Sequence, residues 1–155
     1  MAAVCIGILL SILLADFGIK YYIEKHLPKE KEIPLCKGRI LVRHVHNEGM
    51  ALNFLEKYPW LVKWMSFCAV VFVGIYYGLL FREKGRGVEK ISLSLVLGGA
   101  LSNLYDRFAR KYVVDYVGFR MKRKKWSDIT YNLGDMGIFA GAIGIILYTF
   151  FGKSK

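Results

Sequence analysis

The stretch WMSFCAVVFVGIYYGLLF, from Trp64 to Phe81, decides the fold because its 18 residues carry no charge. A helix of about 18 to 20 apolar residues is long enough to cross the hydrocarbon core of a bilayer. Tyr58 and Trp60 are aromatic residues of the kind found at a membrane interface, and Pro59 is typical of a helix start. The stretch therefore predicts a membrane-spanning helix.

Three further apolar runs surround this one. Residues 136–152 contain 17 uncharged residues, residues 91–105 contain 15, and residues 1–15 contain 15 before an apolar continuation to Ile23. A chain of 155 residues is too short to bury four such helices on every side in water. The first run lacks the basic start and the small-residue cleavage site of a signal peptide, so we expect it to be retained. We predict a single all-α integral membrane domain over 1–155 with four transmembrane helices, at about 4–23, 60–81, 91–110 and 131–151.

The basic residues lie mainly between these runs. The net charge is +11, and anionic lipid explains it more economically than nucleic acid, for which we find no motif. Counted by the positive-inside rule alone, the two long loops would be cytoplasmic. Cys5, Cys36 and Cys68 have neither zinc nor redox spacing, so we expect no metal and no cofactor.

The two long loops differ in character. RILVRHVHN, from Arg39 to Asn47, is rich in β-branched residues and predicts a strand or hairpin at the membrane surface. RMKRKK, from Arg120 to Lys125, together with Trp126, is either a lid at headgroup level or a solvated charge run.

Polar residues inside membrane helices are costly and are functional candidates. Asp16 and Lys20 are four residues apart, so we expect them to share a helix face and to pair structurally. Asn103 and Arg107 have the same spacing. If that helix continues, Asp115 falls near their face, and Asp106 is explained as the counter-ion of Arg107.

Asp115 and Asp135 border the same loop, and hence the same side of the membrane. Two carboxylates that meet in an apolar pocket cannot both ionise easily, so one keeps its proton and the other stays charged. Such a pair supplies a general acid and a general base. The alternative is that each aspartate only caps a loop or a helix.

Four blocks of the sequence resemble signal peptidase II, the lipoprotein signal peptidase family, in the order found there. Two are LGGALSNLYDRFARKYVVDYVGF (97–119), similar to GG-x-x-GN-x-x-DR…V-x-D-[FY], and YNLGDMGI (131–138), similar to FN-[VIL]-AD. NEGMALNFL (47–55) is similar to N-x-G-A-A-F, and ADFGIK (15–20) matches D-x-x-x-K. Together the blocks cover almost the whole chain.

The resemblance implies a role for each matching residue. Asp115 and Asp135 would form the catalytic dyad. Substrate-binding or dyad-supporting positions would be Asn47, Asn103, Arg107 and Asn132. Structural positions would be Asp16, Lys20 and Gly49.

It also implies a reaction and a place in the cell. The reaction would be aspartic endopeptidase cleavage of a prolipoprotein just before its diacylglyceryl-bearing cysteine. The protein would be a multi-pass protein of the bacterial inner membrane, with membrane lipid as a further partner, no nucleic acid, and a monomer favoured. Both termini would be cytoplasmic. The active site would lie near the extracytoplasmic surface, where the first long loop would form a small β-cradle.

Three positions depart from the family pattern: Gly134 replaces alanine, Ser102 replaces glycine, and Met50 stands where a small residue is common. Two other functions compete with the peptidase. One is a non-catalytic, lipid- or peptide-binding paralogue of the same fold. The other is a small transporter in which Asp16, Asp115 and Asp135 carry protons, but its polar residues would lie deep in several spans rather than near their ends.

Overall fold

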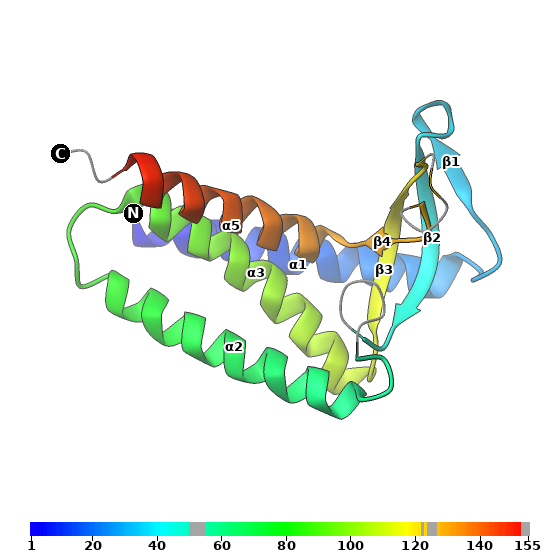
Figure 1. Ribbon diagram of the computed structural model, residues 1–155, viewed down its shortest axis with the longest axis horizontal. Coiled ribbons are helices and arrows are strands. Elements are labelled where there is room, and N and C mark those ends of the chain that lie inside the picture. The colour runs from blue at the N-terminus through cyan, green and yellow to red at the C-terminus, as the bar shows by residue number, and fades with distance from the viewer. Residues whose placement is uncertain (50–54, 122, 124–126, 153–155) are drawn as a thin grey trace.

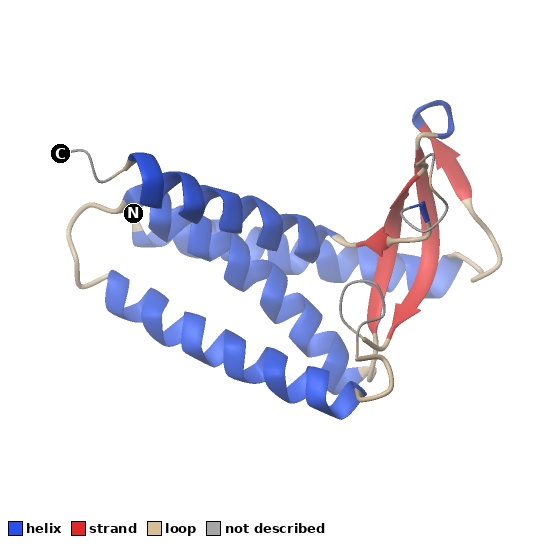
Figure 2. Cartoon of the chain, in the orientation of Figure 1, coloured by secondary structure: helices blue, strands red, loops and turns tan. Residues whose placement is uncertain are grey.

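The computed structural model describes residues 1–49, 55–121, 123 and 127–152, and it consists of a helix bundle with a small sheet at one end (Figure 1, Figure 2). The helices are α1 (Ala2–His26), α2 (Pro59–Leu80), α3 (Gly87–Ala109) and α5 (Leu133–Phe151). The strands are β1 (Ile33–Leu35), β2 (Ile40–Asn47), β3 (Val113–Phe119) and β4 (Thr130–Tyr131), with a short 3₁₀ turn over Cys36–Gly38. The mostly helical membrane fold is confirmed.

Helix α3 lies at the centre of the bundle and packs against α1, α2 and α5. Among the described residues, α1, α2 and α5 are long and apolar enough to cross a membrane. Helix α3 is less apolar, since it buries Glu89, Lys90, Asn103 and Asp106 against its neighbours. Three candidate spans are thus established by length and composition, and the fourth predicted span stays a prediction.

Small residues let α3 and α5 approach closely. A Cβ added to Gly99 of α3 would overlap the carbonyl oxygen of Gly134 of α5, and one added to Gly141 would overlap the carbonyl oxygen of Ser92. Small residues at helix contacts are a common device in membranes, because lipid provides no hydrophobic drive for helices to associate. This contact fixes where α5 begins relative to α3.

The sheet is antiparallel with the order β1-β2-β3-β4. Val45 of β2 lies opposite Asp115 of β3, and Val117 of β3 pairs with Tyr131 of β4. The strand predicted over Arg39 to Asn47 is confirmed as β2. The first long loop forms β1 and β2 of this small sheet, as expected, and the second long loop adds β3 and β4, which were not predicted.

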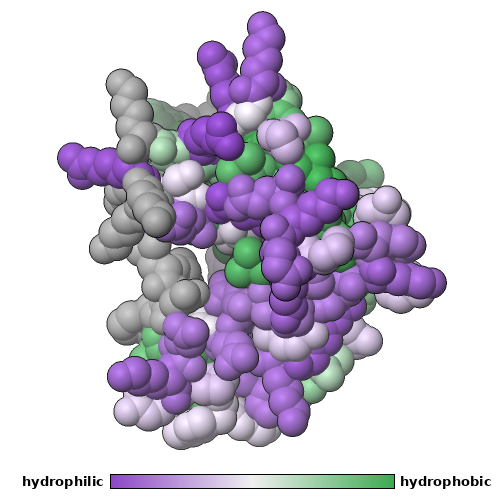
Figure 3. Space-filling view, turned by 90° about the vertical axis from the view of Figure 1, so that its right-hand side faces the viewer, coloured by the Kyte–Doolittle hydropathy of each residue, from purple (hydrophilic) through white to green (hydrophobic). Residues whose placement is uncertain are grey.

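A buried apolar cluster joins the sheet to the end of α1, and its members are Ile23, Leu27, Val114 and Tyr116. Seen from the sheet end, the molecule presents mainly hydrophilic residues (Figure 3). The start of α1, the end of α5 and the turn between α2 and α3 lie at the opposite end of the bundle (Figure 1).

Helix α3 does not continue to Asp115, and it ends close to Arg110, the predicted end of the third span. Helix α3 ends at Ala109, and Lys111 has a left-handed backbone with φ of 74°. The β-branched Val113 and Val114 then begin β3. Asp115 consequently reaches the site from a strand and not from the helix face of Asn103.

Candidate active site

Asp115 lies where the sheet meets the bundle, and its carboxylate is held from two sides. Asn132 donates from Nδ2 to Asp115 Oδ1 at 2.7 Å, and Asn47 donates from Nδ2 to Oδ2 at 2.9 Å. The side chain is only 2% exposed. Burial, and next the charge of Asp135, raise the pKa of Asp115 to about 7, although the two asparagine bonds oppose this rise. This carboxyl therefore holds a proton far more readily than an ordinary aspartate.

Asp135 lies in the first turn of α5. Asn103 donates from Nδ2 to Asp135 Oδ1 at 2.8 Å, and the backbone N–H of Asn132 donates to Oδ2 at 3.2 Å. The Asn132 side-chain oxygen accepts from the N–H of Asp135 at 2.8 Å. These two reciprocal bonds form a capping box in which Asn132 is the N-cap. Asp135 therefore stabilises the start of α5, as the alternative role in helix capping requires. The N-cap residue, however, is Asn132 and not Asp135.

Asn132 connects the two aspartates. Its Nδ2 holds Asp115, while its Oδ1 and its backbone N–H hold Asp135. It is fully buried, so no water competes for these bonds. The two predicted acids are therefore brought into one site by a single asparagine.

Lys20 organises a buried network behind this site. Its ammonium group lies 2.7 Å from Asp16 Oδ2 and 3.1 Å from Asp106 Oδ2, and it donates to Asn103 Oδ1 at 2.8 Å. The predicted pairing of Asp16 with Lys20 is confirmed. Because Lys20 occupies the oxygen of Asn103, the amide nitrogen of Asn103 is left to face Asp135. Lys20 thereby orients the residue that donates to Asp135.

Among the described residues, Asp106 forms no direct ion pair with Arg107, the partner expected from the sequence. It pairs with Lys20 and, at 3.4 Å, with Arg110, and it accepts the N–H of Val114 at 3.2 Å. That last bond links the start of β3 to the end of α3. Asp106 therefore helps to place the strand that carries Asp115.

Sequence reasoning missed the contacts of two residues. Ser102 donates to Asp16 Oδ2 at 2.5 Å and accepts from Lys20 at 3.2 Å. Tyr116 donates its hydroxyl to Asp16 Oδ1 at 2.8 Å and accepts the N–H of Leu133 at 2.9 Å. Both residues contact partners that are distant in sequence, so the spacing of residues along one helix or strand could not predict these contacts. Ser102, a departure from the family pattern, is therefore part of the buried network.

Gly134, a second departure, lies in a tight space. An added Cβ would be 3.0 Å from Asn132 Oδ1 and from the carbonyl oxygen of Gly99, and 3.1 Å from Asp16 Oδ2. An alanine would require these atoms to move by a few tenths of an ångström, so glycine suits the local packing. The third departure, Met50, lies outside the described residues, as does most of the predicted basic lid.

Arg107 lies beside the acid pair and contacts the loop after β2. One of its terminal nitrogens donates to the carbonyl oxygen of Gly49 at 3.3 Å, and the other donates to that of Asn103 at 3.4 Å. Within the described part of the chain, its buried Nε has no partner. Gly49 in turn donates its N–H to Asn47 Oδ1 at 3.0 Å, which keeps the amide nitrogen of Asn47 facing Asp115.

The fold and the site together define an integral membrane protein with a buried acid pair at the junction of a helix bundle and a surface sheet. The sequence model of the family described as signal peptidase (SPase) II matches residues 8–151. The chain belongs to the signal peptidase II family, which is a family of peptidases, and the resemblance seen in the sequence is confirmed.

Similar proteins agree with this assignment. A lipoprotein signal peptidase of Halothermothrix orenii is 32% identical over 91% of each chain. One of Brucella ovis is 35% identical over 94% of this chain and 88% of its own. A solved structure described as a bacterial membrane enzyme has a TM-score of 0.83 at 21% identity and covers 98% of this chain and 90% of its own. At that identity, the solved structure supports the fold alone.

Proposed function

We propose that this protein is a membrane aspartic endopeptidase that removes the signal peptide from diacylglyceryl-modified prolipoproteins. The observation that carries the proposal is the bridging of Asp115 and Asp135 by the buried Asn132. Family membership and relatives named lipoprotein signal peptidases supply the substrate class. Nothing in these comparisons favours the non-catalytic paralogue.

The acid pair would activate water without a covalent intermediate. The ionised carboxylate takes a proton from a water molecule as its oxygen attacks the scissile carbonyl carbon. The protonated carboxyl gives its proton to the carbonyl oxygen, which becomes a hydroxyl group. When the tetrahedral intermediate collapses, the carbon–nitrogen bond breaks, the leaving amine takes a proton from the protonated carboxyl, and one hydroxyl group gives its proton to the other carboxylate. Asp115 and Asp135 titrate as a coupled unit, so the proton belongs to the pair.

The neighbouring polar residues would divide the remaining work. Asn47, Asn103 and Asn132 contact the aspartates in this structure, which favours dyad support over direct substrate binding. Arg107 has a buried donor, Nε, without a partner among the described residues, and we propose that it binds a substrate carbonyl oxygen. Asp16 and Lys20 hold Asn103 and Ser102 in place from behind, and Gly49 does the same for Asn47.

The membrane would deliver the substrate. We propose that α3 crosses the bilayer with α1, α2 and α5, since it packs against all three. The sheet end, which is mainly hydrophilic (Figure 3), then lies outside the hydrocarbon layer, and the acid pair lies at that interface. A signal-peptide helix and two acyl chains would reach it laterally from an inner membrane whose outer surface carries the sheet. A monomer suffices for this arrangement.

The decisive experiment is cleavage of a diacylglyceryl-modified prolipoprotein by purified protein in detergent, with the released signal peptide measured by mass spectrometry. We expect Asp115→Asn and Asp135→Asn each to lower the rate by at least about 100-fold, because each removes a group needed for proton transfer. The same prolipoprotein without its lipid should be cut poorly.

Asp128→Asn is the matched control, because Asp128 is an exposed aspartate close in sequence. It should cleave like the unaltered protein. Binding of the prolipoprotein without cleavage by the unaltered protein would favour the non-catalytic paralogue. Cleavage by both dyad variants at the normal rate would reject the aspartic mechanism.

A further inference from the structure

A second cluster of ionisable side chains lies outside the acid pair and its hydrogen-bond network. Glu24 comes from the last turn of α1, and His44 and His46 come from β2. The two histidines are two residues apart on a strand, so they share one face of the sheet. One ligand atom from each residue lies within 4.8 Å of the other two.

The separations of these atoms are close to those of a tetrahedral zinc site. His44 Nε2 lies 3.4 Å from Glu24 Oε1 and 3.1 Å from His46 Nε2, and His46 Nε2 lies 2.6 Å from Glu24 Oε1. Ligands bonded to zinc at about 2.0–2.1 Å in a tetrahedron stand about 3.3 Å apart. A small opening of the His46–Glu24 contact therefore makes room for the ion.

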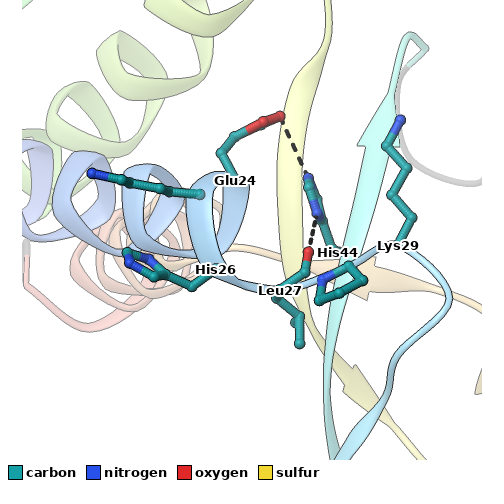
Figure 4. A pocket seen from close by; sticks show the side chains of 7 residues that line it. Glu24, His26, Leu27, Lys29 and His44 are labelled. Atoms are coloured by element: carbon teal, nitrogen blue, oxygen red, sulfur yellow. Dashed lines mark hydrogen bonds and ion pairs between the residues drawn. The ribbon is translucent and has the colours of Figure 1, made fainter.

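The ring of His44 is already fixed as a metal ligand requires. Its Nδ1 lies 2.6 Å from the carbonyl oxygen of Leu27, which can only accept, so Nδ1 carries the proton (Figure 4). The lone pair of Nε2 then points toward Glu24 and His46. A histidine that binds a metal through one nitrogen commonly donates the other N–H to a carbonyl in this way.

Tyr112 and Lys29 complete the surroundings. The Tyr112 hydroxyl donates to Glu24 Oε1 at 3.0 Å, and its ring stacks on His46 with centroids 3.6 Å apart, so both ligands are oriented. Lys29 Nζ lies 3.0 Å from His46 Nδ1, and its side chain is exposed and free to turn into solvent. A pocket lined by Glu24, Leu27, Lys29 and His44 gives access from outside (Figure 4).

We propose that Glu24, His44 and His46 bind a divalent transition metal ion, with zinc the best match to two imidazoles and one carboxylate. Water would occupy the fourth position. On binding, His46 Nε2 loses its proton and bonds the ion, while Nδ1, which accepts from Lys29 in this structure, takes up a proton as Lys29 moves away, so the ring stays neutral. The ion would clamp the end of α1 to β2. This proposal departs from the expectation of no metal and does not rest on the peptidase function.

Metal binding to the full chain in detergent tests this, after chelator treatment and without a polyhistidine tag. We expect one equivalent of Zn²⁺ to bind in calorimetry and to raise the thermal unfolding midpoint. Co²⁺ should give the visible absorption of a tetrahedral site without a thiolate charge-transfer band. His44→Ala, His46→Ala and Glu24→Gln should each weaken Zn²⁺ binding at least about tenfold. Lys29→Ala should strengthen it by about fivefold, because a nearby positive charge is removed.

Two matched controls should bind like the unaltered chain. His26→Ala removes a neighbouring histidine whose ring contacts the Tyr22 carbonyl instead, and Cys36→Ser removes an exposed thiol. Asp115→Asn should also keep the site, which separates this proposal from the catalytic one. If the unaltered chain binds no stoichiometric metal, or if His44→Ala and His46→Ala both bind normally, the proposal is overturned. The Co²⁺ spectrum of the unaltered chain decides the ligand type even if a variant fails to fold.

Discussion

At the scale of single residues, Asn132 combines two tasks that are usually separate. Its oxygen and backbone N–H complete the capping box of α5, and its amide nitrogen holds Asp115. The first task is one that several small polar residues perform equally well. The second needs a donor atom separate from the accepting oxygen on the same side chain, and among the good caps only asparagine has one.

Asn132→Ser separates the two tasks. Serine caps as well as asparagine, so helicity and the unfolding midpoint should stay near their normal values. Cleavage of lipid-modified prolipoprotein should fall by about tenfold or more, because a buried hydrogen bond to a charged group contributes about 1.5–3 kcal/mol. Circular dichroism and the cleavage assay measure the two effects.

Asn132→Ala provides the comparison, since it removes both the cap and the donor and should also lower stability by about 1 kcal/mol. A serine variant that cleaves at the normal rate would show that the bond to Asp115 is dispensable.

The raised pKa of Asp115 has a consequence for stability. The unfolded carboxyl loses its proton near its ordinary pKa of 3.8, while the folded one holds it to about 7. Unfolding therefore releases a proton between these values, and the contribution of this group to stability falls as the pH rises through that window. Asp115→Asn removes this dependence.

The unfolding midpoint of Asp115→Asn, relative to the unaltered chain, should rise from pH 5 to pH 8 by at least about 3 °C. Thermal unfolding in detergent at both pH values measures it. Asp128→Asn, at an exposed position, should show no such change. A difference that is equal at both pH values would contradict the raised pKa.

At the scale of elements, the contact between α3 and α5 sets the geometry of the site. Gly99 meets Gly134, the residue just before Asp135, and Asn103 lies one turn further along α3. Because an α-helix has 3.6 residues per turn, Asn103 lies on the same face of α3 as Gly99. The close approach of the two backbones at Gly99 therefore brings Asn103 within hydrogen-bond distance of Asp135.

Gly99→Ala should force these helices apart, because its Cβ overlaps backbone that cannot rotate away. We expect a loss of about 1–3 kcal/mol in unfolding free energy. Gly74→Ala on α2, where nothing lies within 4 Å of an added Cβ, should be neutral or stabilising by up to about 1 kcal/mol. Thermal unfolding in detergent compares the two, and equal effects would refute the close contact.

The sequence predicted elements better than contacts. Runs of uncharged residues located all four helices, because the bilayer demands long apolar segments. The predicted end of the third span, at about Arg110, lies one residue from the observed end of α3 at Ala109, but the strand that follows and carries Asp115 was not predicted. Pairs within one helix, such as Asp16 and Lys20, follow from spacing. The contacts of Asp106, Ser102 and Tyr116 cross between elements, and only the packed fold reveals them.

At the scale of the whole molecule, charge and family pattern disagree about orientation. The basic loops favour a cytoplasmic sheet by the positive-inside rule, whereas the family pattern places it outside. We propose the outside position. Cys36 then serves as a natural marker, because it is exposed in the turn that follows β1.

A membrane-impermeant thiol reagent should label Cys36 in intact cells, and Cys36→Ser should abolish the labelling. Cys68 lies on the apolar helix α2 and should resist a polar reagent. A reporter fused after Lys155 should be active only in its cytoplasmic form. Labelling only after cell lysis, or an external reporter, would reverse the topology.

Helix α2 packs mainly on α3, and its remaining faces carry exposed apolar side chains such as Phe72 and Ile75. In a bilayer these faces touch lipid, and lipid tails are as apolar as the side chains of another helix. Replacing lipid by a guest helix along α2 therefore breaks no contact between the helices of the protein and changes the free energy little. Because such an exchange leaves the contact between α2 and α3 intact, we expect the bundle to accept a guest helix along α2 without opening.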